Sequence, residues 1–256
     1  MEAKGKAEMI RLENVKVFNL EGAVQGARNP MNSWVKSDSV YGCRLNRETD
    51  NVRWDIFEDG EIMLCKNCLE CETPLCANNF DRREYIIGEN DLNLLKRLVA
   101  AGSDERKFMR QILVSFNITA PLYWWKEYDT YKVATTANST STMHKIHAKP
   151  FEVSDFSVER MSGEAGKQLI GSIIGYLEHN RKLFNQTGDK QYWENIIQIL
   201  PSSYNQMRSL TLNYEVLRNI YHARKHHKLL EWRELCAEIE KMPYSELITM
   251  KAKVAK

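Results

Sequence analysis

The stretch IIQILPSSYNQMRSLTLNYEVLRNIYHAR, residues 196–224, carries the clearest structural pattern in this chain of 256 residues. Its apolar residues, among them Leu217 and Ile220, recur at three- and four-residue spacing. Such spacing places apolar side chains on one face of a helix. It predicts a helix over residues 190–199, which ends in this stretch, and a second helix over residues 203–224.

Two polar residues of the second helix, Asn213 and Arg224, share the spacing of its apolar residues, so both are expected near the inward face. A polar side chain on such a face is either paired inside the protein or available to a ligand. The planar guanidinium of Arg224 suits a phosphate or a pyrimidine carbonyl. The alternative is that Arg224 pairs with a carboxylate of the chain, such as Glu231 or Glu234. We expect a solvated rim from the next three residues, Lys225, His226 and His227.

The rest of the chain mixes strand and helix patterns. The expected strands cover residues 9–20 and 111–120. The further expected helices cover residues 21–30, 91–102, 164–185 and 229–240. Pro30 ends the first of these, while Asp91 caps the start of the second and Gly102 its end. These elements predict an α+β fold with a mixed sheet flanked by long helices and a helix-rich C-terminal half.

Residues 32–81 form an irregular insertion in what we expect to be a single domain of residues 1–256. Two short strand candidates, residues 52–57 and 61–65, lie in it on either side of a turn signal. The insertion carries CKNCLECETPLC, whose thiols belong to Cys65, Cys68, Cys71 and Cys76. Soft thiolate ligands at this spacing can hold zinc or an iron–sulfur cluster. Alternatively, some of these thiols pack as small apolar side chains.

Composition excludes several classes of protein. Lys and Arg number 36 against 34 Asp and Glu, and a net charge of +2 gives no electrostatic case for binding nucleic acid polymers or a membrane surface. No apolar run approaches the roughly 20 residues of a membrane span, and the opening MEAKGKAEMI lacks the apolar core of a signal peptide. We therefore expect a cytoplasmic protein with reduced cysteines.

The segment YWWKEYDTYKVATTANSTSTMH, residues 123–144, joins bulky anchors to a run of small hydroxyl side chains. Trp124 and Trp125 are expected to be buried and to fix the end of a helix. The hydroxyls and backbone donors that follow can wrap an anion without a net charge. Positive charge near this run comes from Lys126, Lys132 and Lys145. The alternative is a surface loop whose Ser and Thr side chains form local turns.

The stretch of residues 196–224 resembles the C-terminal half of the flavin-dependent thymidylate synthases. That family carries a Leu-Pro pair followed by a helix with Asn, Asn and Arg. The residues at matching spacing are Leu200, Pro201, Asn213, Asn219 and Arg224. Asn138 and Ser141 match the Asn and Ser that end the family's Arg-His-Arg signature. The resemblance covers roughly residues 91–237 and, more weakly, the first strand and helix.

The resemblance implies a flavoenzyme that transfers one carbon to C5 of a deoxyuridine monophosphate-type nucleotide and reduces it with a flavin hydride. It implies FAD, with NADPH and a reduced folate as co-reactants, and a bacterial or phage homotetramer whose sites lie between subunits. It assigns cofactor binding to Asn213, Asn219 and Lys132. It assigns binding of the pyrimidine nucleotide to Arg224, Asn138, Ser139, Ser141 and Lys126. It names no obligatory side-chain nucleophile.

The chain departs from the family pattern in its charges. Residues 129–132, Asp-Thr-Tyr-Lys, replace Arg-His-Arg, and Ser139 replaces a Glu. Ile197 and Glu215 stand where the family has two further arginines, and arginines supply strong charge-assisted contacts to phosphate. Two alternatives therefore stay open. One is a non-catalytic nucleotide- or protein-binding homologue stapled by a metal, and the other is a structural protein whose pocket Tyr128 and Tyr131 fill.

Overall fold

The computed structural model describes residues 9–43 and 83–251. The chain divides into two compact units. Of the described residues, the first unit contains 9–18 and 109–251, and the second contains 19–43 and 83–108. Each unit is described by itself below.

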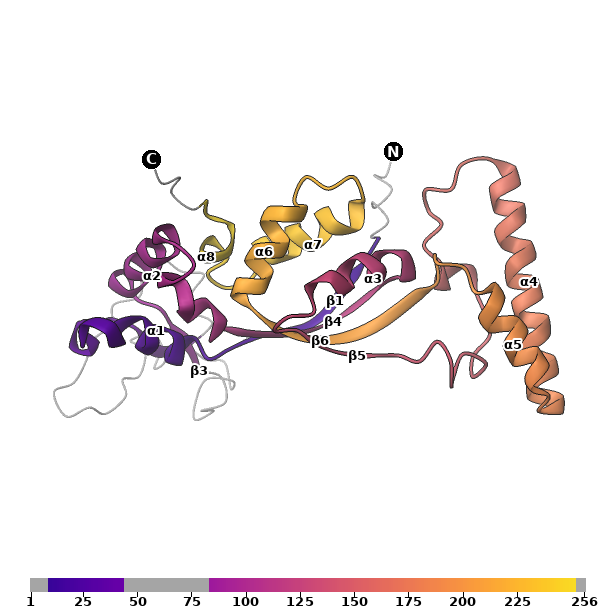
Figure 1. Ribbon diagram of the computed structural model, residues 1–256, viewed down its shortest axis with the longest axis horizontal. Coiled ribbons are helices and arrows are strands. Elements are labelled where there is room, and N and C mark those ends of the chain that lie inside the picture. Colours follow the sequence, from indigo (N-terminus) through magenta and orange to yellow (C-terminus); the bar gives the residue numbers. More distant parts are fainter. Residues whose placement is uncertain (1–8, 44–82, 252–256) are drawn as a thin grey trace, which may run out of the picture. The chain divides into compact units, whose positions relative to one another are not determined.

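The first unit is built on a four-stranded antiparallel sheet (Figure 1). Its strands, in spatial order, are β1 (Arg11–Phe18), β4 (Leu113–Pro121), β6 (Asn205–Asn213) and β5 (Thr136–Ser139). β4 pairs with β6 along its whole length, from Leu113 opposite Asn213 to Pro121 opposite Asn205. The short strand β5 is an edge strand beside β6.

One face of this sheet is apolar and covered by helices. The buried side chains of β4 alternate with half-buried polar ones, because successive strand residues point to opposite faces. The buried set is Val114, Phe116, Ile118 and Ala120. The helices α3 (Leu122–Tyr128), α6 (Tyr214–Arg224) and α7 (Leu230–Glu240) lie on one side of the sheet (Figure 1). The short helix α8 (Glu246–Thr249) packs against α6 and α7.

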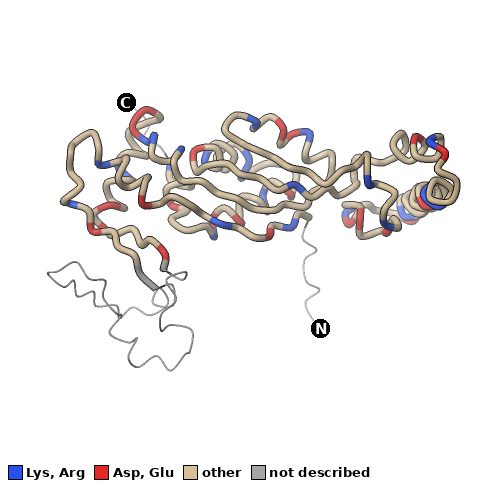
Figure 2. Tube along the Cα trace, turned by 90° about the horizontal axis from the view of Figure 1, so that it is seen from below, with Lys and Arg blue, Asp and Glu red and all other residues tan. Residues whose placement is uncertain are grey.

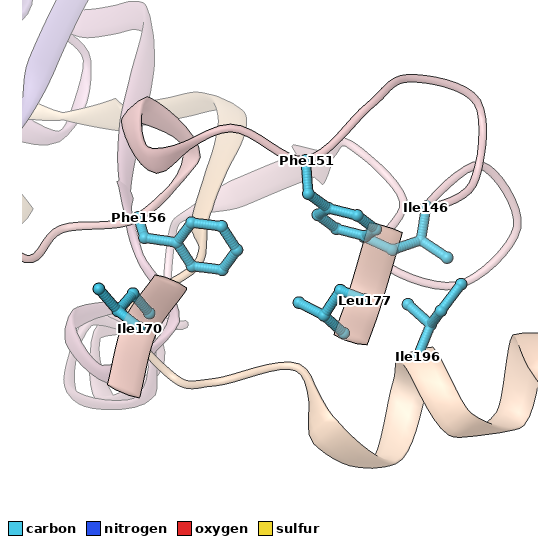
Figure 3. Close-up of a cluster of buried hydrophobic side chains, with 6 residues drawn as sticks. All are labelled: Ile146, Phe151, Phe156, Ile170, Leu177 and Ile196. Atoms are coloured by element: carbon cyan, nitrogen blue, oxygen red, sulfur yellow. The ribbon is translucent and has the colours of Figure 1, made fainter. Parts of the chain in front are cut away.

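Two antiparallel helices of the first unit, α4 (Glu164–Thr187) and α5 (Lys190–Ile199), build a separate apolar cluster. Gly188 takes a left-handed conformation at the end of α4, and Asp189 then caps α5 by accepting the Gln191 N–H at 3.0 Å. Figure 3 shows the buried side chains of this cluster, which come from both helices and from the preceding loop. They are Ile146, Phe151, Phe156, Ile170, Leu177 and Ile196.

The second unit holds two helices and a two-stranded antiparallel sheet. Its elements are α1 (Leu20–Arg28), α2 (Glu89–Ala101), β2 (Val40–Cys43) and β3 (Arg83–Ile86). The carboxylate of Asp38 caps α2 by accepting the backbone N–H groups of Asn90 and Asp91 at 2.8 and 3.0 Å. Gly88 stands at the helix start, where a side-chain Cβ would lie 2.3 Å from the Asp38 carboxyl group. The sequence therefore needs glycine there.

The α+β class is confirmed, and so are most expected elements. Among the described residues, every strand pair is antiparallel. The single helix expected over residues 203–224 is wrong, because its first half is β6. Leu210 and Leu212 are buried while Ser209 and Thr211 are exposed, which is the two-residue period of a strand. The strand candidates at residues 52–57 and 61–65 lie outside the described residues.

Asp91 does not cap α2, which corrects a second expectation. It lies inside the first turn of the helix and is fully buried, where Arg28, Ser37 and Ser39 all donate to its carboxylate. Among the described helices, none is long and apolar enough to cross a membrane.

Candidate functional site

The candidate site lies in the first unit, at the end of α3 and the turn between α6 and α7, over a cluster of buried aromatic rings. Trp124 and Trp125 are buried, as the sequence predicts. The Trp124 ring lies 4.7 Å from that of Trp232 on α7, and the Tyr128 ring stacks on Trp232 at 6.1 Å. Trp125 donates its Nε1–H to the Gln206 carbonyl at 2.9 Å. These contacts tie α3 to α7 and to β6.

Arg224, the last residue of α6, lies on the rim of this aromatic cluster. Its Nε–H donates to the Tyr131 hydroxyl at 3.0 Å, and its guanidinium lies 4.7 Å from the centre of the Trp232 ring. Its two Nη groups make no hydrogen bond to any described residue, and 19% of the side chain is exposed. The Tyr131 hydroxyl therefore holds the guanidinium at its Nε edge, and the Trp232 ring holds it at its planar face. The Nη groups of Arg224 remain available for an acceptor with two oxygens, such as a carboxylate or a phosphate.

The carboxylate nearest to Arg224 is Glu127, on the outer side of α3. Its Oε2 accepts the Trp232 Nε1–H at 2.6 Å and lies 3.7 Å from Arg224 Nη1. The same oxygen lies 3.8 Å from Nε2 of His227. A carboxylate therefore lies beside Arg224, as the alternative interpretation expects, but it is Glu127 and not Glu231 or Glu234.

Glu231 and Glu234 have other partners. Glu231 accepts a hydrogen bond from the Tyr123 hydroxyl, and burial together with this carboxylate raises the pKa of Tyr123. Glu234 accepts the backbone N–H groups of Met9 and Ile10 at 2.8 and 3.1 Å. Glu231 is almost fully buried, and its Oε2 has no hydrogen-bond partner among the described residues.

Arg208, on β6, is a residue of this region that the sequence interpretation missed. Its guanidinium lies 4.2 Å from the centre of the Trp125 ring and forms an ion pair with Asp129 at 2.8 Å. Arg208 pairs with Ser139 in the sheet, so a guanidinium stands beside the hydroxyl run. The signal was the alternation of β6, which a helical interpretation of residues 203–213 hides.

The hydroxyl run forms the exposed edge strand β5 and a turn. Asn138 and Ser139 are exposed on β5, opposite Ser209 and Arg208 of β6. Ser141 accepts the backbone N–H groups of Met143 and His144 at 3.1 and 2.7 Å. That arrangement is a local serine turn, the alternative that the sequence left open.

Lys126 on α3 and Lys132 after the 3-10 turn Asp129–Tyr131 are exposed, and neither forms an ion pair with a described residue. Lys132 follows Tyr131, the partner of Arg224, so it belongs to the same end of α3. Positive and negative residues are otherwise interspersed along the described chain (Figure 2). The cations at this end of α3 are therefore few, and the carboxylates of Glu127 and Asp129 lie among them.

The residues expected to bind flavin come from two segments, with Asn213 and Asn219 on α6 and Lys132 directly after the turn Asp129–Tyr131. Asn213 is the N-cap of α6, and its Oδ1 accepts the Val216 N–H at 3.0 Å. Asn219 is exposed on α6. Asn213 and Arg224 stand at opposite ends of α6, about 16 Å apart along a helix with a rise of 1.5 Å per residue. The exposed amide of Asn219 and ammonium of Lys132 are donors of the kind that a flavin ring can accept, whereas the Asn213 oxygen is already used as a helix cap.

The four cysteines proposed as metal ligands, Cys65, Cys68, Cys71 and Cys76, lie outside the described residues. Within residues 9–43 and 83–251, no three His, Cys, Asp or Glu side chains are grouped as metal ligands. Cys236 is a buried free thiol on α7, and burial raises its pKa to about 12.

Comparison with known proteins identifies similar structures but no similar sequence. No family model matches the chain, and no curated protein matches it. The flavin-dependent thymidylate synthase ThyX of Helicobacter pylori, solved with FAD and dUMP, is 16% identical and aligns with a TM-score of 0.57. The alignment covers 93% of this chain and 98% of that one. A second structure of the Helicobacter pylori enzyme, also with FAD and dUMP, is 14% identical with a TM-score of 0.56, over 94% and 99% of the chains. The chain thus has the fold of the flavin-dependent thymidylate synthases, in strongly divergent sequence.

Proposed function

We propose that this protein is a thymidylate-synthase-like enzyme that acts at C5 of a deoxyuridine monophosphate-type nucleotide. The reaction would be a one-carbon transfer with reduction by a flavin hydride. The observation that carries the proposal is the guanidinium of Arg224, which is fixed by Tyr131 and Trp232 while its Nη groups make no hydrogen bond to a described residue and have only Glu127, at 3.7 Å, as a nearby carboxylate. The fold shared with an enzyme solved with FAD and dUMP supports it.

In this proposal the nucleotide phosphate lies at the Nη edge of Arg224, because a bidentate charge-assisted contact is the strongest that one side chain can offer a phosphate. The exposed ammonium groups of Lys126 and Lys132 add positive charge at the same end of α3. Asn138, Ser139 and Ser141 offer neutral donors and acceptors for the polar edge of the pyrimidine.

FAD, when bound, would supply the hydride. Because Asn213 stands at the far end of α6 from Arg224, we place the flavin between subunits of a homo-oligomer, a tetramer by resemblance. Asn219 and Lys132, both exposed, would then contact a flavin held partly by another subunit. NADPH and a reduced folate would be the co-reactants, also by resemblance. The residues of this chain would bind and orient the nucleotide.

Flavin content and dUMP binding test the proposal on the full-length protein. We expect flavin in the visible spectrum of the purified protein or after flavin is added. In heavy water with all co-reactants, the C5 proton signal of dUMP should disappear. Arg224→Gln should weaken dUMP binding by about tenfold or more, as for the loss of a charged hydrogen bond. Arg233→Gln, an exposed change on α7, is the matched control. A protein that takes up no flavin and binds no dUMP would exclude this function.

The second candidate is a non-catalytic homologue that binds a nucleotide or a protein. In this candidate a structural metal bound by Cys65, Cys68, Cys71 and Cys76 stabilises the chain. The pairing of Arg208 with Asp129 favours it, because a carboxylate of the chain neutralises a guanidinium beside the hydroxyl run. A colourless protein that binds dUMP, and that holds zinc or iron until a chelator removes it, would support this candidate.

A further inference from the structure

Three hydrogen-bond donors converge on a single oxygen atom at the turn between α6 and α7. Oε2 of Glu127 lies 2.6 Å from Nε1 of Trp232, 3.7 Å from Nη1 of Arg224 and 3.8 Å from Nε2 of His227. All three donors come from nine consecutive residues, 224–232, whereas the acceptor comes from α3. The turn between the two helices thus surrounds one oxyanion.

Each of the three donors is fixed by a contact that does not involve Glu127. Arg224 is held by the Tyr131 hydroxyl and by the face of Trp232. His227 accepts the Leu229 N–H through its Nδ1 at 3.2 Å, so in the neutral ring the remaining proton is on Nε2, which faces Glu127. Trp232 is fully buried among aromatic rings. The donors are therefore arranged before any ligand arrives, which lowers the entropic cost of binding.

The acceptor is held less firmly than the donors. The Glu127 side chain is 39% exposed, and its distances to Arg224 and His227 are too long for hydrogen bonds. The carboxylate therefore uses only one of the three donors fully. An anion with several oxygens, such as a phosphate monoester, could approach the other two.

We propose that residues Arg224, His227 and Trp232 form an oxyanion site, in which Glu127 is the resident anion and competes with an incoming phosphate. The phosphate exchanges with the Glu127 carboxylate, so this acidic residue sets the affinity of the site. The assignment of the ligand as the phosphate of a nucleotide rests on the proposed function, whereas the convergence of the donors does not. His227 then belongs to the ligand site rather than to a solvated rim.

Titration calorimetry with Glu127→Gln in the full chain tests this site, with inorganic phosphate, dUMP and deoxyuridine as ligands. Glutamine keeps an oxygen that can accept the Trp232 indole N–H, so the variant should fold. It lacks the negative charge of the carboxylate. We expect the variant to bind phosphate and dUMP at least about fivefold more tightly than the wild type, because the competing negative charge of Glu127 is removed. Deoxyuridine, which lacks the phosphate, should show no gain. Adding Arg224→Gln or His227→Ala to this variant should abolish the gain.

Glu238→Gln on α7 is the matched control, because it removes one carboxylate that pairs with Lys241 and not with Arg224. Its affinity for phosphate should stay within about twofold of the wild type at physiological salt, where distant charges are screened. The inference is overturned if Glu127→Gln binds phosphate no more tightly than Glu238→Gln, or if its gain survives the loss of Arg224. A different outcome would reject the proposed enzyme function but not the oxyanion site. In that outcome the wild type binds neither dUMP nor flavin, while Glu127→Gln still binds phosphate more tightly than the wild type does.

Discussion

Arg28 and Asp91 form a buried ion pair in the second unit, with Nε of the arginine 2.5 Å from Oδ1 of the aspartate. Oδ2 of Asp91 accepts the hydroxyls of Ser37 and Ser39 at 2.6 and 2.5 Å. The other nitrogens of Arg28 donate to the carbonyls of Ser33 and Lys36. One ion pair therefore joins α1, α2 and the segment between α1 and β2.

Replacing Asp91 with Asn should destabilise the second unit by about 3 kcal/mol, because it leaves the buried positive charge of Arg28 without a negative counter-charge. Hydrogen exchange of the amides in α1 and α2 measures the loss locally. Asp104→Asn, an exposed change in the same unit, should alter exchange little. Equal protection in the two variants would show that the ion pair does not stabilise this unit.

The same carboxylate should make the stability of the second unit depend on pH. Burial opposes ionisation of Asp91, but the hydrogen bonds from Ser37, Ser39 and Arg28 outweigh it and lower its pKa. The stabilisation is thus complete above the unfolded-state pKa of about 3.9 and is lost as the pH falls through the lower folded value. Amide protection of α2 should decrease with acidity in the wild type, and Asp91→Asn should show a flatter dependence. Parallel pH profiles for the two proteins would contradict this assignment.

Asn213 offers a way to separate a structural role from a ligand role. Asn213→Ala should lower the free energy of unfolding by about 1 kcal/mol, because it removes the cap on the Val216 N–H. Asn213→Asp keeps an acceptor and should retain most of that stability, as chemical denaturation followed by circular dichroism can measure. If Asn213 also contacts a flavin through its amide nitrogen, the aspartate variant should lose flavin while staying folded. A stable alanine variant would show that the cap contributes little.

The sequence predicts most elements of the fold because their apolar periods are long and their ends carry clear signals. The helix Lys190–Ile199 has the expected bounds, since Asp189 caps its start and Pro201 follows its end. β6 was hidden because Leu210 and Leu212 also fit a helical spacing when residues 213–224 continue it. Only pairing with β4, a contact distant in the sequence, decides between the two periods.

The site was less predictable than the fold, because partners of charged residues depend on tertiary contacts. The sequence placed Arg224 at a ligand site but gave it a partner on the next helix, whereas Glu127 lies almost a hundred residues earlier. Asp91 is of a residue type that is common at helix N-caps, yet Asp38 caps the helix and Asp91 is buried. Neither choice follows from local spacing, because each depends on which segment the fold brings alongside.

Two leucines on α4 should differ sharply when truncated. Leu177 is fully buried in the cluster of Figure 3, and Leu177→Ala should destabilise the protein by about 2–5 kcal/mol through lost burial and a cavity. Leu169 is 61% exposed on the same helix, and Leu169→Ala should change stability by no more than about 0.5 kcal/mol. Thermal unfolding of both variants measures the contrast. Similar losses for the two would mean that the exposed face of α4 is covered by a partner in solution.

The Cys236 thiol should be unreactive in the folded protein. Burial raises its pKa to about 12, and its thiol faces the Tyr221 carbonyl at 3.9 Å. Near neutral pH it is therefore almost entirely protonated, and the nucleophilic thiolate is scarce. Alkylation followed by peptide mass spectrometry should label Cys236 only after denaturation, and the denatured sample serves as the control for intrinsic reactivity. Rapid labelling in the native protein would require that α7 opens readily, because reagent and thiolate must meet in a site that the folded helix closes.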